Sequence, residues 1–347
     1  MNLYSLIRLP RRIGNKFRSQ GLILLYHRVA TLDTDPQLLS VTPEHFAEHL
    51  EYLSEHYNPM SLSELCNALK AGKIPKRSIV ITFDDGYADN LWNAKPLLER
   101  NEISATVFVT SGYIGSDREF WWDDLERLLL LPEQLPNRLE LTIGGRNRKW
   151  DLTGDVEYTT GQRSSTRSDP WNVTMASDPG PRYTIYRDLH RILNVLPCGQ
   201  QETILSAITQ WAGVSRTGRA PYRALTAGEL KQLARGGLVE IGAHTVTHAR
   251  LSAQTASIQK GEIARSKESL EEILGREVRS FSYPFGQNED FNSNCVEFIK
   301  GAGFTAACTN YGSTLTRSAD PYCLPRAMVR DWDVQTFAAR IKEWFDG

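Results

Sequence analysis

Residues 79–87 read IVITFDDGY, a short apolar run that ends at two adjacent aspartates and a glycine. β-Branched and aromatic residues in so short a run predict a parallel strand that is covered on both faces. Asp84 and Asp85 would then lie at the carboxyl end of this strand, where α/β folds place their reactive groups. Because neighbouring carboxylates repel each other, a bound cation would stabilise the pair. A simpler alternative is a turn in which one aspartate caps a helix over 87–100.

A second strand-like run, LVEIGA at 238–243, is followed by HTVTH at 244–248. Histidines four residues apart lie on one face of a helical turn and can bind the same metal ion. Together with one aspartate, the two histidines of this motif would form three protein ligands and leave positions open for water, as in catalytic zinc sites. His45 and His49 have the same spacing, but they lie inside an expected helix with no strand end nearby. Solvated helix positions explain that second pair better.

TFDDG at 82–86 followed by His-Thr-x-x-His at 244–248 resembles the polysaccharide deacetylase superfamily, also called NodB-like or carbohydrate esterase family 4. The resemblance implies an α/β fold, a distorted seven-stranded (β/α) barrel with a long, mainly helical insertion. The barrel would comprise residues 21–116 and 225–347. Residues 117–224 show no strand-helix alternation, so they would form an insertion with its own packing.

The resemblance also implies the roles of the motif residues. Asp84 would be the catalytic base, whereas Asp85, His244 and His248 would bind a divalent metal ion. Zinc is the first choice for this ion, with cobalt or nickel as alternatives. The implied activity is a metal-dependent hydrolysis that removes the acetyl group from an N-acetylated sugar of a glycan or a lipid-linked saccharide.

The family's third motif, Arg-x-Pro-aromatic-Gly, is only partly present. Its last three residues are found as PFG at 284–286, and the resemblance implies that the backbone N–H of Phe285 helps to bind the oxyanion of the reaction. The motif's arginine is missing, because Ser282 stands in its place. Arg326, near the last expected strand, could instead bind Asp84 through both guanidinium nitrogens and keep it ionised. A surface salt bridge is the alternative for this arginine.

Many family members carry a Leu-x-His sequence near the C-terminus that protonates the leaving amine, but no histidine follows His248 in this chain. His27 is the best substitute, because it follows the apolar run 21–26 and would lie at a strand end on the same face. This arrangement resembles the branch of the family that includes the poly-N-acetylglucosamine deacetylases. A structural hydrogen bond is the alternative role for His27.

Composition limits the function classes further. The chain of 347 residues is 41% hydrophobic and 23% charged, which is enough for one large domain or two smaller ones. A net charge of -1 gives no overall field that would attract nucleic acid, so no such partner is expected. Five irregularly spaced cysteines without a C-x-x-C pair favour reduced thiols in a cytosolic protein.

Residues 1–20 form a basic arm in which apolar residues alternate with arginine and lysine, interrupted by Pro10. The arm lacks the uninterrupted apolar run of a secretory signal or of a membrane span. We therefore expect a cytoplasmic protein whose arm could contact the anionic inner surface of a membrane. An ordinary docking arm is the alternative, and the sequence does not indicate an oligomeric state.

Two other functions are compatible with these residues. The same metal chemistry would serve an O-acetyl esterase or a deformylase acting on a lipid-linked sugar, and the basic arm favours a substrate near a membrane. A non-catalytic carbohydrate-binding barrel would explain the missing arginine and the missing Leu-x-His. Such a binder would not need Asp84 beside a metal ligand, and bound metal with sensitivity to a chelator would distinguish it from an enzyme.

Overall fold

The computed structural model of the protein describes residues 21–153, 171–312 and 314–346. The described residues divide into two compact units, unit 1 within the ranges Met1–Thr31, Leu39–Ile114 and Leu225–Gly347 and unit 2 within the ranges Leu32–Leu38 and Gly115–Ala224. The basic arm at residues 1–20 lies outside the described residues, so its membrane contact stays a prediction. Within the described part of the chain, no helix combines the length and the apolar character that crossing a membrane requires.

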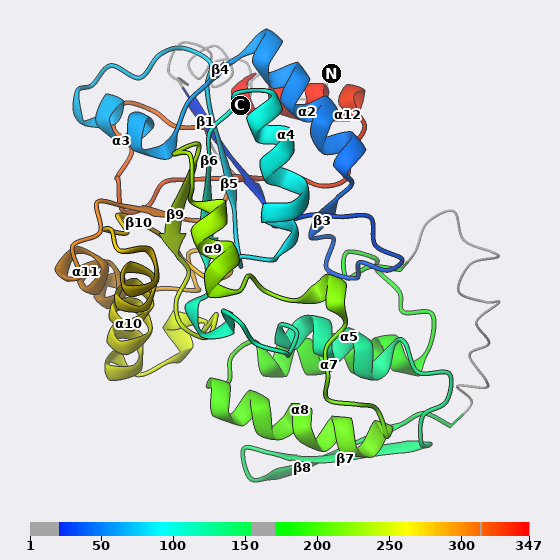
Figure 1. The fold of residues 1–347 in the computed structure, drawn as a ribbon. Coiled ribbons are helices and arrows are strands. Elements are labelled where there is room, and N and C mark those ends of the chain that lie inside the picture. Colours follow the sequence, from blue (N-terminus) through cyan, green and yellow to red (C-terminus); the bar gives the residue numbers. More distant parts are fainter. Residues whose placement is uncertain (1–20, 154–170, 313, 347) are drawn as a thin grey trace, which may run out of the picture. The chain divides into compact units, whose positions relative to one another are not determined.

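Unit 1 is built around a parallel sheet of eight strands, seven of which follow one path in the order β11-β10-β9-β6-β5-β1-β12 (Figure 1). The eighth, β4, pairs with β5 away from this path. The strands are β1 (Gly21–Tyr26), β4 (Asn58–Pro59), β5 (Ser78–Phe83), β6 (Ala105–Val109), β9 (Val239–Ala243), β10 (Ser280–Ser282), β11 (Ala306–Cys308) and β12 (Ala327–Met328). The seven strands of the path are those expected from the sequence, which confirms the predicted fold.

The two ends of this path meet through one short segment of the chain. Cys308 in β11 forms an isolated parallel bridge with Leu324. The chain then continues directly into β12, where Ala327 pairs with Leu24 of β1. The segment 324–328 therefore links the two edges of a curled sheet, and Arg326 lies in the middle of it. The short β12 and this single bridge are what distort the barrel.

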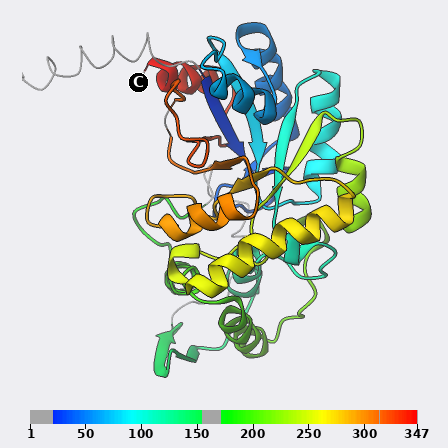
Figure 2. The same ribbon diagram turned by 90° about the vertical axis from the view of Figure 1, so that its left-hand side faces the viewer.

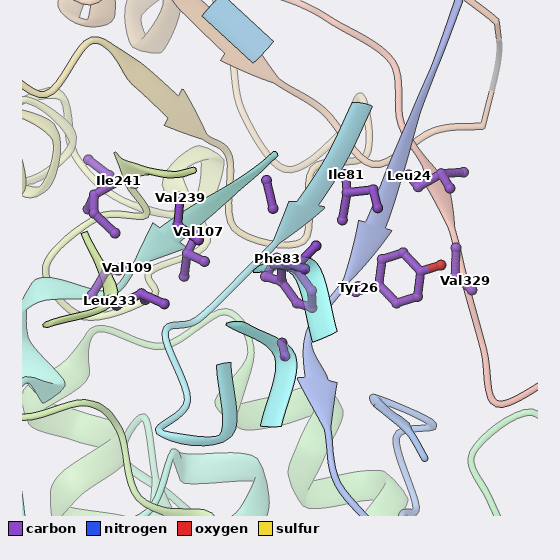
Figure 3. Close-up of a cluster of buried hydrophobic side chains, with 14 of the residues drawn as sticks. Leu24, Tyr26, Ile81, Phe83, Val107, Val109, Leu233, Val239, Ile241 and Val329 are labelled. Atoms are coloured by element: carbon purple, nitrogen blue, oxygen red, sulfur yellow. The ribbon is translucent and has the colours of Figure 1, made fainter. Parts of the chain in front are cut away.

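The two faces of the sheet bury different sets of side chains. The outer cluster includes Ile81 and Phe83, which Figure 3 shows among other buried strand residues. Side chains from α2, α4, α9, α10, α11 and α12 belong to the same cluster. The second cluster contains Val80 and side chains from β1, β6, β11 and α3. Because this cluster joins β1 and β11, which lie far apart along the path, it marks the concave inner face. Successive side chains of a strand alternate between faces, so Thr82 and Asp84 follow Val80 onto the inner side.

Helices separate the strands in the sequence and, apart from α3, which packs in the second cluster, cover the outer face of the sheet, as Figure 2 shows for the long α10. The α-helices of unit 1 are α2 (Pro43–His56), α3 (Leu62–Lys70), α4 (Lys95–Arg100), α9 (Ala227–Leu233), α10 (Ala256–Leu274), α11 (Ser293–Gly301) and α12 (Val334–Asp346). Its shorter elements are β2 (Arg28–Val29), β3 (Ser40–Val41), η2 (Asn90–Ala94), η3 (Ser111–Tyr113) and η5 (Leu251–Ala253). Capping explains several of the helix starts: Ser61 and Thr226 each form a capping box with a glutamate three residues later.

The helix expected over 87–100 is present, but it starts a few residues later as the π-helical η2 and continues as α4, where Pro96 has no N–H to donate to the preceding turn. Another local expectation is wrong. His49 is not solvated but buried, because its ring stacks on Phe337 with 3.8 Å between centroids and its Nε2 lies 2.8 Å from the carbonyl oxygen of Trp332. His45 is partly exposed.

Unit 2 has its own core. Its helices are α5 (Trp121–Leu129), α7 (Pro181–Leu193), α8 (Cys198–Ala212) and the short η4 (Ala220–Tyr222), and its hairpin consists of β7 (Arg138–Ile143) and β8 (Arg146–Asp151). Trp121 and Trp122 are buried in α5, where they anchor the helix. Their burial gives these two side chains a packing role in unit 2.

Candidate active site

Four side chains from four segments meet on the inner face of the unit 1 sheet at its carboxyl end. The backbone ladder continues past the strands, since Asp84 N–H donates to the carbonyl oxygen of Tyr26 and His244 N–H to that of Val109. Asp84 follows β5 and His244 follows β9, each two residues beyond an inward-facing strand position. Ser282 and Arg326 reach the same place from β10 and from the segment before β12. The predicted convergence of distant motifs is therefore present.

Asp85, His244 and His248 form a buried cluster whose potential ligand atoms all lie within 4.8 Å of one another. The distance from Asp85 Oδ1 is 3.4 Å to His248 Nε2 and 3.7 Å to His244 Nε2. Burial lowers the pKa of both histidines below their usual range, which keeps the imidazoles neutral and able to donate a lone pair.

The orientation of His244 is set by a hydrogen bond on its other nitrogen. His244 Nδ1 lies 2.8 Å from the carbonyl oxygen of Ser282 and donates to it, since a carbonyl can only accept. The proton therefore resides on Nδ1, and the lone pair of Nε2 points toward Asp85. A metal-ligating histidine commonly has such a partner. One carboxylate and two neutral imidazoles at these distances fit the donor set of a zinc ion.

Positive φ angles at non-glycine residues gather in this region. Asp85 has φ 73°, and Gly86 N–H donates to the carbonyl oxygen of Asp84 over 3.0 Å, which closes a tight turn with Asp85 at its centre. His248 has φ 56°. Gly86 itself has φ 84°, and a Cβ atom there would lie 2.9 Å from Val109 Cγ1. Such strained conformations cluster at functional sites, where the surrounding structure holds them.

Asp84 is bound by a guanidinium, as the sequence predicted for Arg326. Arg326 Nη1 donates to Asp84 Oδ1 over 2.8 Å and Nη2 to Oδ2 over 2.7 Å, and both residues are buried. Burial alone would raise the pKa of Asp84, but the adjacent guanidinium holds this pKa well below its usual range. The alternatives of a helix cap for Asp84 and of a surface salt bridge for Arg326 are therefore wrong.

Three further contacts fix the guanidinium, and the sequence reasoning did not name them. Arg326 donates to Ser282 Oγ over 2.7 Å, to Thr82 Oγ1 over 3.2 Å and to the carbonyl oxygen of Thr309 over 2.9 Å. Ser282 Oγ also donates to Asp84 Oδ2 over 3.2 Å. Ser282 was noticed only as the residue that replaces the motif's arginine. Its alternation with the inward-facing Ser280 on β10 is the signal that could have identified it.

His27 follows β1 at the same end of the sheet. Its main-chain carbonyl accepts a hydrogen bond from Asn90 Nδ2 over 2.9 Å, which ties this position to the start of η2. Burial lowers the pKa of His27 to about 3, although the nearby charge of Asp84 opposes this shift. The ring is therefore neutral at pH 7, within electrostatic reach of Asp84. Its role as proton donor stays a prediction.

Phe285 also lies at the site. It has φ 62°, and Gly286 N–H donates to the carbonyl oxygen of Pro284 over 2.7 Å, so Phe285 is the centre of a second tight turn. Its ring meets the imidazole of His248 edge-on with 4.8 Å between centroids. Phe285 is thus adjacent to the histidine cluster, and the predicted contact of its N–H with an oxyanion stays a prediction.

Comparison with known proteins identifies the family. The sequence model of a family described as polysaccharide deacetylase matches residues 71–134 and 174–307. This match includes the two aspartates, the two histidines and Phe285, whereas His27 and Arg326 lie outside it.

Individual proteins agree with this family match. A poly-β-1,6-N-acetyl-D-glucosamine N-deacetylase of Staphylococcus aureus is 31% identical over 121 residues, which are 31% of this chain and 41% of that protein. The fold is similar to that of the Streptococcus pyogenes deacetylase PplD, solved in complex with acetate, with a TM-score of 0.56 and 16% identity over 93% of this chain and 98% of that one. It is also similar to IcaB from Ammonifex degensii, with a TM-score of 0.56 and 15% identity over 95% of this chain and 98% of that one. Because the family match spans more than half of the sequence, as the two motifs predicted, the chain belongs to the polysaccharide deacetylase family.

Proposed function

We propose that this protein is a metal-dependent hydrolase that removes N-acetyl groups from an N-acetylated sugar of a glycan or a lipid-linked saccharide. The observation that carries the proposal is the pairing of a three-ligand cluster with a separate, arginine-bound carboxylate at the same strand ends. The name of the Staphylococcus aureus relative supports an N-acetylglucosamine polymer as substrate, although the chain spans about two fifths of that protein.

Asp85, His244 and His248 would hold the divalent ion, with zinc as the first choice and cobalt or nickel as alternatives. When bound, the ion supplies Lewis acidity, which polarises the acetyl carbonyl and lowers the pKa of water. The chain would do the rest. Asp84, kept ionised by Arg326, accepts a proton from the attacking water. The bidentate contact with Arg326 also prevents the carboxylate of Asp84 from turning away.

The reaction also needs a group that stabilises the negative oxygen of the intermediate and a group that gives a proton to the leaving nitrogen. The backbone N–H of Phe285 stabilises the oxygen that becomes negative when water adds to the carbonyl carbon. The proton that Asp84 accepts from water passes to His27, which is neutral at the start, and from His27 to the sugar nitrogen as the C–N bond breaks. The products are acetate and a free amino sugar. One water is consumed and no redox partner is required.

The alternatives use the same site. An O-acetyl esterase or a deformylase on a lipid-linked sugar would need only a different acyl group or leaving group. A non-catalytic carbohydrate-binding barrel is less consistent with the site, because a buried ion pair between Asp84 and Arg326 is costly to desolvate and a binder has no need of it.

Product analysis tests the proposal. Purified protein is incubated with β-1,6- and β-1,4-linked N-acetylglucosamine oligomers, and separately with an O-acetylated and an N-formylated sugar, each with and without a chelator, and free amine, acetate and formate are measured. We expect equal amounts of amine and acetate, lost on chelation and restored by zinc. Asp84→Asn should keep the metal and lose turnover.

Each other product pattern contradicts the proposal in a definite way. Acetate from the O-acetylated sugar, with no amine from the oligomers, would indicate an esterase, and formate from the N-formylated sugar, with no acetate from the oligomers, would indicate a deformylase. Protein that contains no metal, binds no added zinc and releases no product would favour the carbohydrate-binding barrel. An Asp84→Asn variant with full activity would refute the role of the base.

A further inference from the structure

The peptide segment between the two candidate metal-binding histidines is held from two sides. On one side, Ser111 N–H donates to the carbonyl oxygen of Thr245 over 3.1 Å, and Gly112 N–H donates to that of Val246 over 2.8 Å. A Cβ atom on Gly112 would lie 2.5 Å from the Val246 carbonyl oxygen. The absence of a side chain on Gly112 therefore allows the two backbones to approach this closely.

On the other side, a single carboxylate binds the N–H groups of the same segment. Glu262 Oε2 accepts from Val246 N–H over 2.9 Å and from Thr247 N–H over 2.8 Å, and Oε1 accepts from Thr247 Oγ1 over 3.0 Å. Glu262 projects from α10 and is 5% exposed. A buried carboxylate is costly unless its oxygens are bonded, and here three donors converge on it.

This segment would not keep its shape without outside contacts. Thr245 has φ 62° and His248 has φ 56°, left-handed conformations that are uncommon outside glycine and rarest for a β-branched residue such as Thr245. Such conformations persist only where the surroundings determine them. Hydrogen bonds from adjacent peptide N–H groups to one carboxylate fix the peptide planes between the two histidines, and hence the positions from which both imidazoles project.

We propose that Glu262 is a positioning residue of the metal centre, which holds the 245–247 segment so that His244 and His248 present their nitrogens to one divalent cation. This inference rests on the proposed metal centre. The three hydrogen bonds of Glu262 go to the backbone and side chain of residues 246 and 247, and none of them goes to an imidazole. Its carboxylate geometry, rather than its charge, is the feature that matters.

Two substitutions separate geometry from charge. In Glu262→Gln, the amide oxygen can accept both backbone N–H groups while the amide NH2 donates to Thr247 Oγ1, so all three contacts survive without the charge. Glu262→Leu removes all three contacts. Glu268 lies exposed on the same helix, and Glu268→Leu is the matched control for a lost negative charge.

Zinc affinity is measured by competition with a chromophoric chelator, and the cobalt-substituted proteins are compared by their visible absorption spectra. We expect Glu262→Leu to bind zinc about 10–100-fold more weakly and to show an altered cobalt spectrum. Glu262→Gln and Glu268→Leu should resemble the unmodified protein in both measurements. Thermal unfolding of the metal-free proteins shows which variants are folded.

The results distinguish this inference from the proposed function. Unmodified protein that binds no zinc would refute the metal centre itself. Zinc binding with equal affinity by the unmodified protein and by folded Glu262→Leu would refute only the role of Glu262. If Glu262→Leu does not fold, the Glu262→Gln variant decides. Unchanged zinc affinity and an unchanged cobalt spectrum in Glu262→Gln support positioning. A roughly 10–100-fold weaker zinc affinity in Glu262→Gln would show that the charge is required and would overturn the inference.

Discussion

Replacing Arg326 with methionine removes the guanidinium from Asp84 and retains an unbranched apolar side chain of similar reach. In the unmodified protein two hydrogen bonds of 2.7 and 2.8 Å join the guanidinium of Arg326 to the carboxylate of Asp84, and both side chains are buried. The substitution therefore leaves a buried carboxylate whose remaining contact in this network is the hydroxyl of Ser282. We expect a large loss of stability, because an uncompensated charge remains inside the sheet.

The magnitude follows from the geometry. Charges about 4 Å apart attract by about 4 kcal/mol at an effective dielectric constant of about 20. Removing one partner of a buried ion pair typically costs about 3–5 kcal/mol, which agrees with that value. An exposed ion pair would contribute about 0–1 kcal/mol, so the two accounts of Arg326 differ several-fold in the loss they predict.

The loss should depend on pH in a definite direction. Arg326 lowers the pKa of Asp84 below its usual value of 3.8, so the stabilisation is present above about pH 4 and disappears only as the pH falls through the lower, folded-state pKa. In Arg326→Met, burial raises the pKa of Asp84 instead, and stability decreases as the pH rises through that raised value. The difference in free energy of unfolding should therefore be smallest near pH 4 and largest near pH 7.

Urea unfolding followed by circular dichroism, in the presence of a chelator, measures this difference at both pH values. Asp84→Asn provides the control, because Arg326→Met in that background removes no partner of a buried negative charge and should cost much less. A loss of about 1 kcal/mol or less, a loss that does not change between pH 4 and pH 7, or an equal loss in the Asp84→Asn background would each refute the reasoning.

Three other outcomes are expected. His244→Ala should reduce the zinc content of the purified protein to near zero by elemental analysis, because it removes one of three ligands; full zinc content would contradict the ligand assignment. His27→Gln should lower the rate of amine release and leave zinc content unchanged, and an unchanged rate would show that this imidazole delivers no proton. Gly86→Ala should reduce the free energy of unfolding by about 1 kcal/mol or more, because φ at this position is 84° and the added Cβ would lie 2.9 Å from Val109 Cγ1. Urea unfolding measures this difference, and equal stability of the two proteins would show that the turn adapts.

Much of the fold and site follows from local patterns that need no tertiary information. Most strands of the seven-strand path lie in short apolar runs, and the parallel arrangement places all carboxyl ends at one edge. Asp84 and His244 each follow such a run directly, so their convergence could be expected from the sequence. The π-helical start at η2 could not be expected from the sequence, because it depends on Pro96 in the next turn. The burial of His49 could not be expected either, because it depends on Phe337 from α12.

Glu262 was missed for a related reason. It is one of several glutamates on α10, and in the sequence nothing separates it from those that face solvent. Helical spacing places it next to the buried Ile263, but its partners are main-chain N–H groups of another segment. Every residue except proline has a backbone N–H, so the sequence does not indicate which of these groups will bind a carboxylate. The positioning role of Glu262 can therefore be recognised only in the folded structure, where the two segments are in contact.

The arginine shows most clearly what a motif can and cannot establish. A buried carboxylate that must stay ionised needs a cation beside it, and this requirement does not specify which strand supplies the cation. In this protein β10 contributes the small Ser282, and the segment before β12 contributes Arg326, whose Nη2 lies 2.7 Å from the Ser282 hydroxyl. A larger side chain at position 282 would occupy the space that the guanidinium fills. Ser282 and Arg326 therefore form one arrangement, and the serine that reads as a defect in the third motif makes the replacement possible.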